Sequence, residues 1–325
     1  MNTTISRSKA KCVIFLIISF AVLFEAKGQD HENLESILDR VRSEKARIAG
    51  SNIKTQTTWI YQYSDGKLRG ADGVKTAYFE YHRNGNMRKQ INYNPNGSEL
   101  NQLVISYDSS GNVDEISTST SDALGGNRIE YEYDNDSILT SAISYDVFDN
   151  ANMIVEFQYD PDGNIAEVLT HNPEKTVYVK SKFRFDKYRR LIETTGFDAE
   201  GKTMSKLSFQ YEGDDNKISE QITEIPAAGV ILRTKNRYDT NGNLTEMISR
   251  NAEGRVTSKI TQKFNGRGQV KEIVNLTPAA NLSSKTVYEY DGAGNIREQI
   301  TYNKLDEPVT LIKYEYEYYE QSRQK

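Results

Sequence analysis

Glutamates that recur at a fixed spacing are the residues of this 325-residue chain that could most directly do chemistry. A row of carboxylates beside tyrosine hydroxyls could hydrogen-bond the hydroxyl groups of a sugar or hold a cation. The row consists of Glu115, Glu167, Glu193, Glu246, Glu272 and Glu298, with Glu220 in one unit of irregular length. We expect the neighbouring tyrosines of such a ligand site to be Tyr159, Tyr238 and Tyr290.

A structural role for the same glutamates competes with ligand binding. Each lies two residues after an aliphatic residue, as Glu167 does after Ile165, so we expect it on the same strand face as the apolar side chains. A carboxylate in an apolar row needs a partner. A Lys, Arg or Tyr on the neighbouring strand could provide one, and the resulting ladder would fix the strand register. We favour the ladder over the ligand site.

Patterns that indicate catalysis or metal binding are missing from the sequence. The chain after residue 28 has no cysteine, which excludes thiol catalysis and zinc–thiolate sites there. Its histidines, His31, His82 and His171, form no HExxH pair, and no nucleophile elbow or phosphate loop is present. Asp160–Asn164 resembles part of a calcium loop but lacks the full ligand set, so we interpret it as a turn. We therefore predict no catalytic residue, no metal and no cofactor.

The elements that position the glutamates belong to an internal repeat of 26 residues. A second aromatic residue or Ile lies two residues before each aromatic anchor, except where Asn236 and Gln262 stand. One interval is 27 residues, because the segment 213–217 contains an extra residue. Such a repeat must be recognised before any other feature, since it decides the architecture. The anchors are Tyr81, Tyr107, Tyr133, Tyr159, Phe185, Tyr211, Tyr238, Phe264, Tyr290 and Tyr316.

Each repeat unit predicts two antiparallel strands. Segments such as 155–159 alternate apolar and polar residues, and the Asp-x-x-Gly-Asn that follows is typical of a turn. A second turn, such as 94–97, lies halfway through the unit. We predict an all-β fold, an antiparallel meander of about twenty strands from about ten units, curled as a single-layer sheet or a spiral. A short helix over 30–47 should precede it, and a β-solenoid is the alternative architecture.

The first 28 residues predict an export signal. Basic residues precede an apolar run over 12–24, and small residues precede the bond after Gly28. The run is shorter than the roughly 20 residues that a membrane span needs. We expect cleavage after Gly28, secreted or periplasmic localisation and no membrane span after cleavage. The chain then divides into a signal peptide, a helix with its linker and a repeat domain, at 1–28, 29–50 and 51–325.

The charge of the chain restricts its partners. Without residues 1–28 the chain has 37 basic and 45 acidic residues, a net charge of −8. This balance disfavours nucleic acid, which needs a basic surface. We predict a glycan or an extracellular or periplasmic protein as the partner.

The turn strings resemble the YD repeats of the Rhs family. They are YDSSGN (107–112), YDPDGN (159–164), YDTNGN (238–243) and YDGAGN (290–295), and the resemblance covers about 56–318. It implies a spiralling β-sheet that can wrap into a hollow shell, as in toxin containers, adhesion proteins and surface proteins, many of them carbohydrate-binding. The chain departs from the large members in its longer unit and in lacking a self-cleaving core and a toxin domain. We therefore expect the shape, and not the toxin role, to carry over.

These observations lead to one functional prediction and two alternatives. We predict an exported, non-catalytic scaffold for binding or adhesion at the bacterial cell envelope, with a glycan or a protein as its ligand. The first alternative is a structural envelope or secretion-accessory protein without a small ligand. The second is a carbohydrate-active enzyme, because a pair of close carboxylates could hydrolyse a glycosidic bond.

Overall fold

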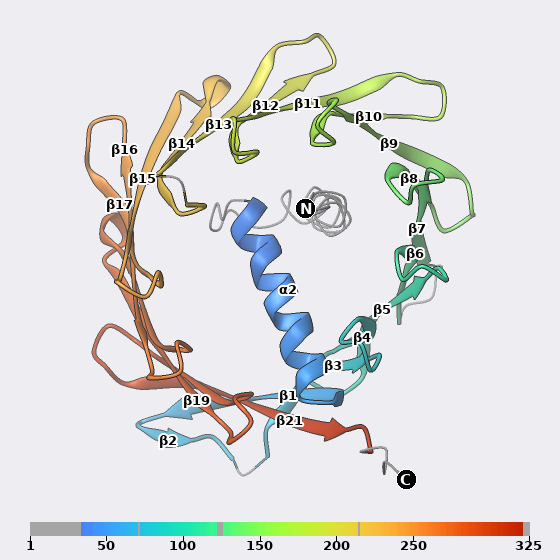
Figure 1. Ribbon diagram of the computed structural model, residues 1–325. Helices are drawn as coiled ribbons and strands as arrows, with labels where there is room; N and C mark the ends of the chain where they lie inside the picture. The colour runs from blue at the N-terminus through green and yellow to red at the C-terminus, as the bar shows by residue number, and fades with distance from the viewer. Residues whose placement is uncertain (1–33, 71, 122–125, 214, 321–325) are drawn as a thin grey trace, which may run out of the picture. The chain divides into compact units, whose positions relative to one another are not determined.

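The computed structural model describes residues 34–70, 72–121, 126–213 and 215–320, and the predicted signal peptide lies outside them. The described residues form one α-helix, 21 strands and two short 3₁₀ helices (Figure 1). In chain order they are α2 (Leu34–Gly50), β1 (Ile53–Ser64), β2 (Lys67–Leu68), β3 (Val74–Tyr81), β4 (Met87–Tyr93), β5 (Glu99–Tyr107), β6 (Val113–Thr120), β7 (Gly126–Tyr133), β8 (Leu139–Tyr145), β9 (Ala151–Tyr159), β10 (Ile165–His171), β11 (Val177–Phe185), β12 (Leu191–Asp198), β13 (Thr203–Tyr211), β14 (Ile218–Ile225), η1 (Pro226–Ala228), β15 (Val230–Tyr238), β16 (Leu244–Asn251), β17 (Val256–Phe264), β18 (Val270–Thr277), η2 (Pro278–Ala280), β19 (Leu282–Tyr290), β20 (Ile296–Tyr302) and β21 (Pro308–Tyr318).

Strands that follow one another in the sequence pair antiparallel. This holds from β3 to β10 and from β11 to β21. The short strand β2 pairs with the end of β1 and is additional to the two-strand units. The predicted antiparallel meander is confirmed. The solenoid alternative is wrong, because its coils would pair strands in parallel across a whole unit.

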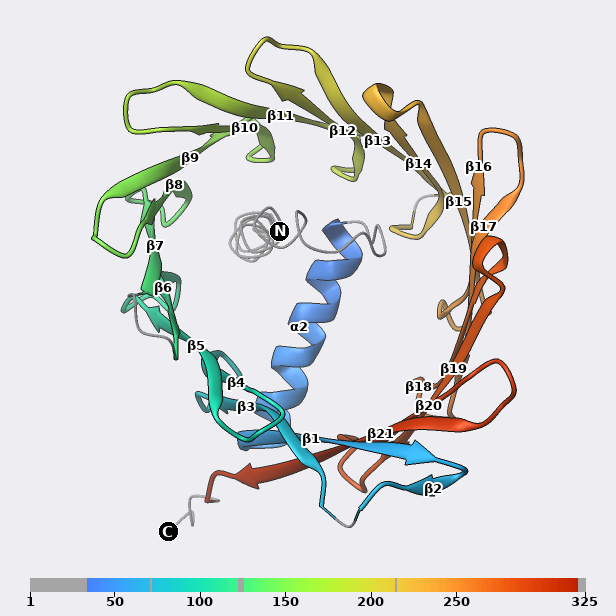
Figure 2. The ribbon, with the colours of Figure 1, turned by 180° about the vertical axis from the view of Figure 1, so that it is seen from behind.

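The strands fall into two compact units. The first contains α2, the start of β1, strands β3 to β10 and the end of β21. The second contains the rest of β1, β2 and most of the strands from β11 to β21. Within each unit the hairpins follow one another in a single layer (Figures 1 and 2).

The predicted N-terminal helix is confirmed as α2, and its last turns pack on the first unit (Figure 2). Ile48 is only 1% exposed. A Cβ on Gly85, in the turn between β3 and β4, would lie 2.1 Å from the backbone oxygen of Lys45, so a glycine is needed there. Burial, and to a smaller extent the charge of Glu44 in α2, raise the pKa of the anchor Tyr81. No described helix is long and apolar enough to cross a membrane.

Most hairpin turns share one hydrogen-bond pattern, which the turn between β5 and β6 illustrates. Asp108 N–H donates to the carbonyl of Asn112 at 2.9 Å, and Gly111 N–H donates back to the carbonyl of Asp108 at 3.0 Å. The Asp108 carboxylate also accepts the backbone N–H groups of Ser110 and Asn112, each at 2.8 Å. The fourth residue of the turn has a positive φ, 79° at Gly111 and 58° at Ser137. The Asx residue and the left-handed residue thus determine the turn, as the sequence predicts.

A β-bulge follows each of these anchor turns and changes which side chains share a face. Tyr107 pairs with Val113, whereas its neighbour Ser106 pairs with Glu115, so Asp114 is left out of the register. The same shift recurs in the hairpins from β3–β4 to β19–β20. Paired residues share a face and consecutive residues do not, so the bulge puts Glu115 on the face opposite to Tyr107. The expectation that the glutamates share the apolar face is therefore wrong.

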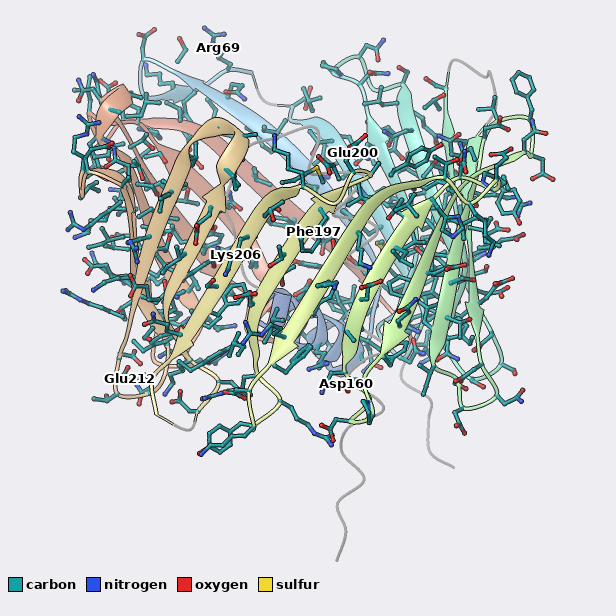
Figure 3. All side chains as sticks on the ribbon, turned by 90° about the horizontal axis from the view of Figure 1, so that it is seen from above. Arg69, Asp160, Phe197, Glu200, Lys206 and Glu212 are labelled. Atoms are coloured by element: carbon teal, nitrogen blue, oxygen red, sulfur yellow. The ribbon has the colours of Figure 1, made fainter. Side chains whose placement is uncertain are left out.

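The two faces of the sheet differ in composition. The face of the anchors is the core, in which Ile105, Tyr131 and Phe209 are 2–6% exposed. The opposite face holds the glutamates with lysines and arginines, such as Lys206 on β13. In Figure 3, Lys206 lies on the strand surface of the second unit, between Glu212 at one end of the strands and Glu200 at the other. The ladder glutamates and their cationic partners thus lie on the face opposite to the anchors.

Candidate functional site

Most of the predicted glutamates make ion pairs with cationic side chains on neighbouring strands. Glu246 is the most enclosed example, with Lys259 Nζ at 2.6 Å from Oε2 and Arg237 at 3.0 Å from Oε1. The other pairs are Glu193 with Lys206 (3.0 Å) and Arg184 (3.4 Å), Glu272 with Lys263 (2.7 Å), Glu298 with Lys313 (3.9 Å) and Glu115 with Arg128 (3.9 Å). In the strand register Glu167 lies opposite Gln158, and Glu220 opposite Lys235. This geometry supports the ladder hypothesis.

The pKa values of two glutamates of the ladder, Glu246 and Glu193, are lowered by their cationic partners. The hydrogen bond from Lys259 is the main reason that the pKa of Glu246 lies below its ordinary value, and the charge of Arg237 adds to it. Burial alone would raise the pKa of Glu193, but the hydrogen bond and charge of Lys206 lower it overall. Both carboxylates are therefore ionised and already paired at neutral pH.

The anchor tyrosines use their hydroxyl groups to hold successive units together. Tyr159 donates to the carbonyl of Leu139 at 2.8 Å, and Tyr290 to that of Val270 at 2.7 Å. Tyr238 makes the same bond, at 3.0 Å, to Ile218. In each case the acceptor begins the strand after the preceding anchor turn. The same latch, at 2.7 Å, is made by Tyr107, Tyr133 and Tyr211.

The structure therefore does not bring the predicted tyrosines and glutamates together in one binding surface. They lie on opposite faces of the sheet, and both sets make contacts within the protein. The sequence did not predict that the tyrosines and glutamates lie on opposite faces, because the residue at the β-bulge, such as Asp114, has no characteristic type.

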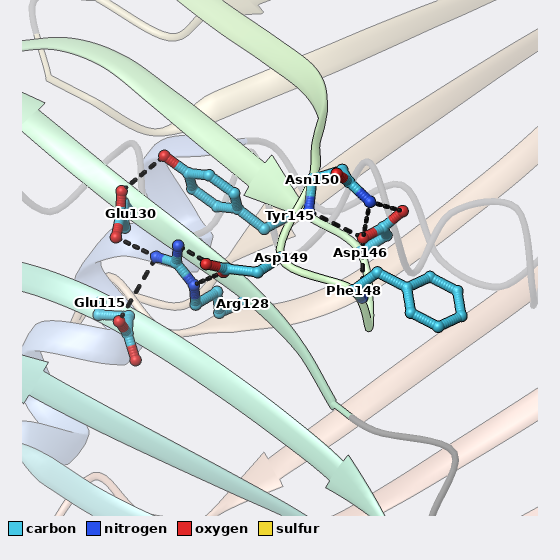
Figure 4. Close-up of polar contacts among 8 residues, drawn as sticks. All are labelled: Glu115, Arg128, Glu130, Tyr145, Asp146, Phe148, Asp149 and Asn150. Carbon is cyan, nitrogen blue, oxygen red and sulfur yellow. Dashed lines mark hydrogen bonds and ion pairs between the residues drawn. The ribbon is translucent and has the colours of Figure 1, made fainter.

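A polar cluster in the first unit surrounds Arg128 (Figure 4). Its guanidinium makes ion pairs with Glu130 and with Asp149, the latter at 2.7 Å, and lies over the ring of Tyr145 at 3.8 Å. The Tyr145 hydroxyl in turn donates to Glu130 at 2.8 Å. Glu115 and Glu130 are direct cross-strand neighbours, so Arg128 also relieves the repulsion between two carboxylates.

The turn that Arg128 anchors presents an exposed aromatic side chain. Phe148 is 80% exposed, and its ring points away from the cluster in Figure 4. Asp146 accepts the backbone N–H groups of Phe148 and Asn150, each at 2.9 Å. With Asp149 bound to Arg128, both ends of the turn are held, so the ring is displayed from an ordered backbone.

The second unit contains a groove of about 680 Å³ that is open to solvent. Its lining contains one predicted ligand residue, Tyr238. The full lining is Tyr211, Glu212, Gly213, Ser219, Asn236, Arg237 and Tyr238. Two irregularities in the sequence mark this place, the interval of 27 residues and the loss of the aromatic at position 236.

No metal site accompanies these features in the part of the chain that the structure describes. None of its His, Cys, Asp and Glu residues form a group of three or more that could hold an ion.

Bulged hairpins, Asx turns and tyrosine latches together define the class of protein, an antiparallel sheet of YD-type repeats. Residues 88–214 match the family model described as Teneurin YD-shell. The predicted resemblance to the Rhs/YD-repeat family is thereby confirmed over this part of the chain. No curated protein matches the chain.

The solved structures that match the chain do so at low sequence identity and low TM-score. The crystal structure of TcdB2-TccC3-Cdc42 has a TM-score of 0.37 at 10% identity, over 83% of this chain and 18% of that one. The Photorhabdus luminescens Tc holotoxin pore has a TM-score of 0.32 at 10% identity, over 77% and 17%. A porin-like protein from Bacteroides uniformis has a TM-score of 0.35 at 11% identity, over 82% and 97%. The chain thus spans less than a fifth of the toxin chains.

Proposed function

We propose that the protein is an exported, non-catalytic scaffold that binds a glycan or a protein at the bacterial cell envelope. The export step rests on the predicted signal peptide, with cleavage after Gly28 and secreted or periplasmic localisation. The sheet supplies the rigid framework, and its surface features supply the binding.

One observation carries this proposal: the side chains that could do chemistry already have partners within the sheet. The glutamate Glu246 is neutralised by two cations, and the hydroxyl of Tyr238 is bonded to the backbone. A carboxylate that acts as a general acid needs a raised pKa, whereas the pKa of Glu246 is lowered. These groups stabilise a surface and are poorly suited to catalysis.

A glycan array with residues 29–325, followed by titration of any hit, tests the glycan part of the proposal. Saturable binding without release of a shortened sugar supports a binding scaffold. Turnover of the bound glycan would show a carbohydrate-active enzyme and contradict the non-catalytic assignment.

The protein part of the proposal is favoured by the exposed ring of Phe148. Rigid aromatic side chains are frequent anchors at protein interfaces. We expect cross-linking in the native envelope to capture a partner that Phe148→Ser loses, with an unchanged melting temperature. If neither a glycan nor a protein is bound, the protein is instead a structural envelope or secretion-accessory component.

A further inference from the structure

We propose that Arg233 and Arg250 bind the carboxylate group of an acidic sugar. The two residues lie directly opposite each other on β15 and β16, on the face of the sheet that also holds Arg237 and Glu246. Both side chains are exposed to solvent. This inference rests on the proposed glycan-binding function and gives that function a place and a ligand class.

The other hairpins show what the repeat normally places opposite the cation at this position. A basic residue recurs five positions before the anchor in most units from β7 onwards, and the residue opposite it is aromatic, aliphatic or acidic. These pairs are Arg128 with Tyr145, Lys180 with Phe197, Lys206 with Glu224, Lys259 with Leu276 and Lys285 with Tyr302. Arg233 instead faces a second cation, Arg250. Like charges directly opposite each other destabilise a sheet, and such departures from the stabilising pattern are expected at functional sites.

The same hairpin also lacks the carboxylate that balances the cation in two of these units. Arg128 makes an ion pair with Asp149 at 2.7 Å, and Lys285 makes one with Asp306. Both acids occupy the left-handed position of the turn after the second strand, with φ values of 65° and 62°. The equivalent residue after β16 is Gly254, with a φ of 79° and no side chain. A carboxylate that the repeat supplies elsewhere is therefore missing beside Arg233.

No other residue of the described chain takes the place of that carboxylate. Within residues 34–70, 72–121, 126–213 and 215–320, neither Arg233 nor Arg250 has a carboxylate oxygen within 4.0 Å of its guanidinium nitrogens. The nearest acid along β14, Glu224, lies opposite Lys206. Arg250 donates one N–H group to the carbonyl of Gly254 at 3.0 Å, which orients its guanidinium. The remaining N–H groups of the two arginines are available to a ligand.

Two guanidinium groups side by side favour a planar anion with two oxygens, because each can donate two parallel N–H groups to a carboxylate. The residues that flank the pair are aliphatic. Ile222 lies opposite Arg233 on one side, and Val256 lies opposite Arg250 on the other. Both are partly exposed and offer apolar contacts to the C–H face of a sugar ring. An acidic sugar matches both features, whereas a neutral sugar has no group that could neutralise the two charges.

The test compares the two arginines with a cation that already has a partner. Uronate-containing, sulfated and neutral oligosaccharides are presented on one array to residues 29–325, and the hits are titrated with each variant. We expect Arg233→Gln and Arg250→Gln each to weaken uronate binding at least about tenfold, or about 1.4 kcal/mol. Lys263→Gln removes the same charge from the same face, but Lys263 is paired with Glu272 at 2.7 Å. This control should bind as the unsubstituted protein does.

A stability measurement separates a ligand site from a structural role of the pair. Arg250→Tyr gives Arg233 the partner that Arg128 has in Tyr145, and it removes the repulsion between two cations. We expect an unchanged or higher melting temperature together with the loss of uronate binding. Higher ionic strength should also weaken the binding, because the contact is between exposed charges. A lower melting temperature with unchanged binding would show that the pair is structural.

Three further results would overturn the assignment. Uronate binding that survives both substitutions by Gln places the sugar elsewhere on the protein. Hits restricted to neutral or sulfated sugars exclude the ligand class and leave the proposed glycan-binding scaffold intact. An array without hits excludes the sugar site, and a protein partner captured by cross-linking would then still support the scaffold.

Discussion

Ser137 holds a backbone conformation that most of the equivalent turns give to glycine. Its φ is 58°, and the corresponding residue of another turn, Gly163, has a φ of 81°. The left-handed region is unfavourable by roughly 1–2 kcal/mol for a residue with a Cβ. We expect Ser137→Gly to stabilise the fold by on the order of 0.5–1 kcal/mol, because the relief of strain exceeds the entropy that glycine adds to the unfolded chain. Urea denaturation measures the difference. The reverse change, Gly163→Ser, should lower the midpoint, and a gain there would contradict the account.

Glu246 should make the stability of the protein depend on pH. Its pKa is lowered in the folded state, from an ordinary value of 4.5, chiefly by the hydrogen bond from Lys259. A lowered carboxyl pKa stabilises the fold above about pH 4.5, and that stabilisation is lost as the pH falls through the folded-state pKa. We expect Glu246→Gln to lose about 1 kcal/mol at pH 7 and to approach the unsubstituted protein near pH 3. Denaturation at both pH values checks this.

A matched control comes from a glutamate outside the ladder. Glu253 pairs with Arg255 at 3.2 Å, and both side chains are well exposed. Glu253→Gln should change the stability less at either pH. If sugar binding falls in Glu246→Gln while its stability does not, the row is a ligand site and not a ladder.

At the scale of elements, the contact between α2 and the first turn of the repeat depends on one glycine. A Cβ at Gly85 would lie 2.1 Å from the Lys45 carbonyl oxygen, whereas Gly111, in the equivalent turn, has open space around it. We expect Gly85→Ala to lose more than about 2 kcal/mol, as overpacked sites do, and to expose the last turns of α2 to hydrogen exchange. Gly111→Ala should lose only the roughly 1 kcal/mol of backbone strain. Equal losses would show that the helix does not rest on this turn.

The elements were predictable from the sequence to the extent that they depend on local chemistry. The anchors, the Asx turns and the amphipathic helix follow from residue type and spacing, and the structure has all three. The face of Glu115 did not follow, because the bulge at Asp114 arises from how the left-handed turn joins its two strands. A residue of any type can occupy that position, so the alternation of side chains alone gives the wrong face.

The candidate groove was only partly predictable for a related reason. Tyr238 was among the expected ligand residues, but it was chosen as a member of a regular row. The groove is defined by departures from that row, at Asn236 and in the turn that begins at Glu212. Whether a departure opens a cavity depends on how the neighbouring turn is held, and the contacts of Arg190 with Gly213 join segments that the sequence does not show to be in contact.

At the scale of the whole molecule, the proposed export predicts a defined N-terminus. The apolar run at 12–24 and the small residues before Gln29 should direct cleavage after Gly28. We expect intact-mass analysis of protein from the native envelope to show a chain that starts at Gln29. Gly28→Pro should block cleavage and leave the longer chain, because proline replaces the small residue that the cleavage site needs and lacks the backbone N–H that an extended substrate pairs with. A native chain that retains Met1 would contradict the export assignment.

The longer turn after Tyr211 shows how this architecture tolerates change. Although this turn contains an extra residue, Tyr211 still pairs with Ile218, and Gln210 still pairs with Glu220, as in the units of regular length. The length of a turn is thus independent of the register of the strands that it joins, because the bulge and the tyrosine latch fix that register separately. Hairpin turns of this sheet can therefore change in length during evolution without a change in strand pairing. A protein engineer could insert foreign peptides into the same turns for display.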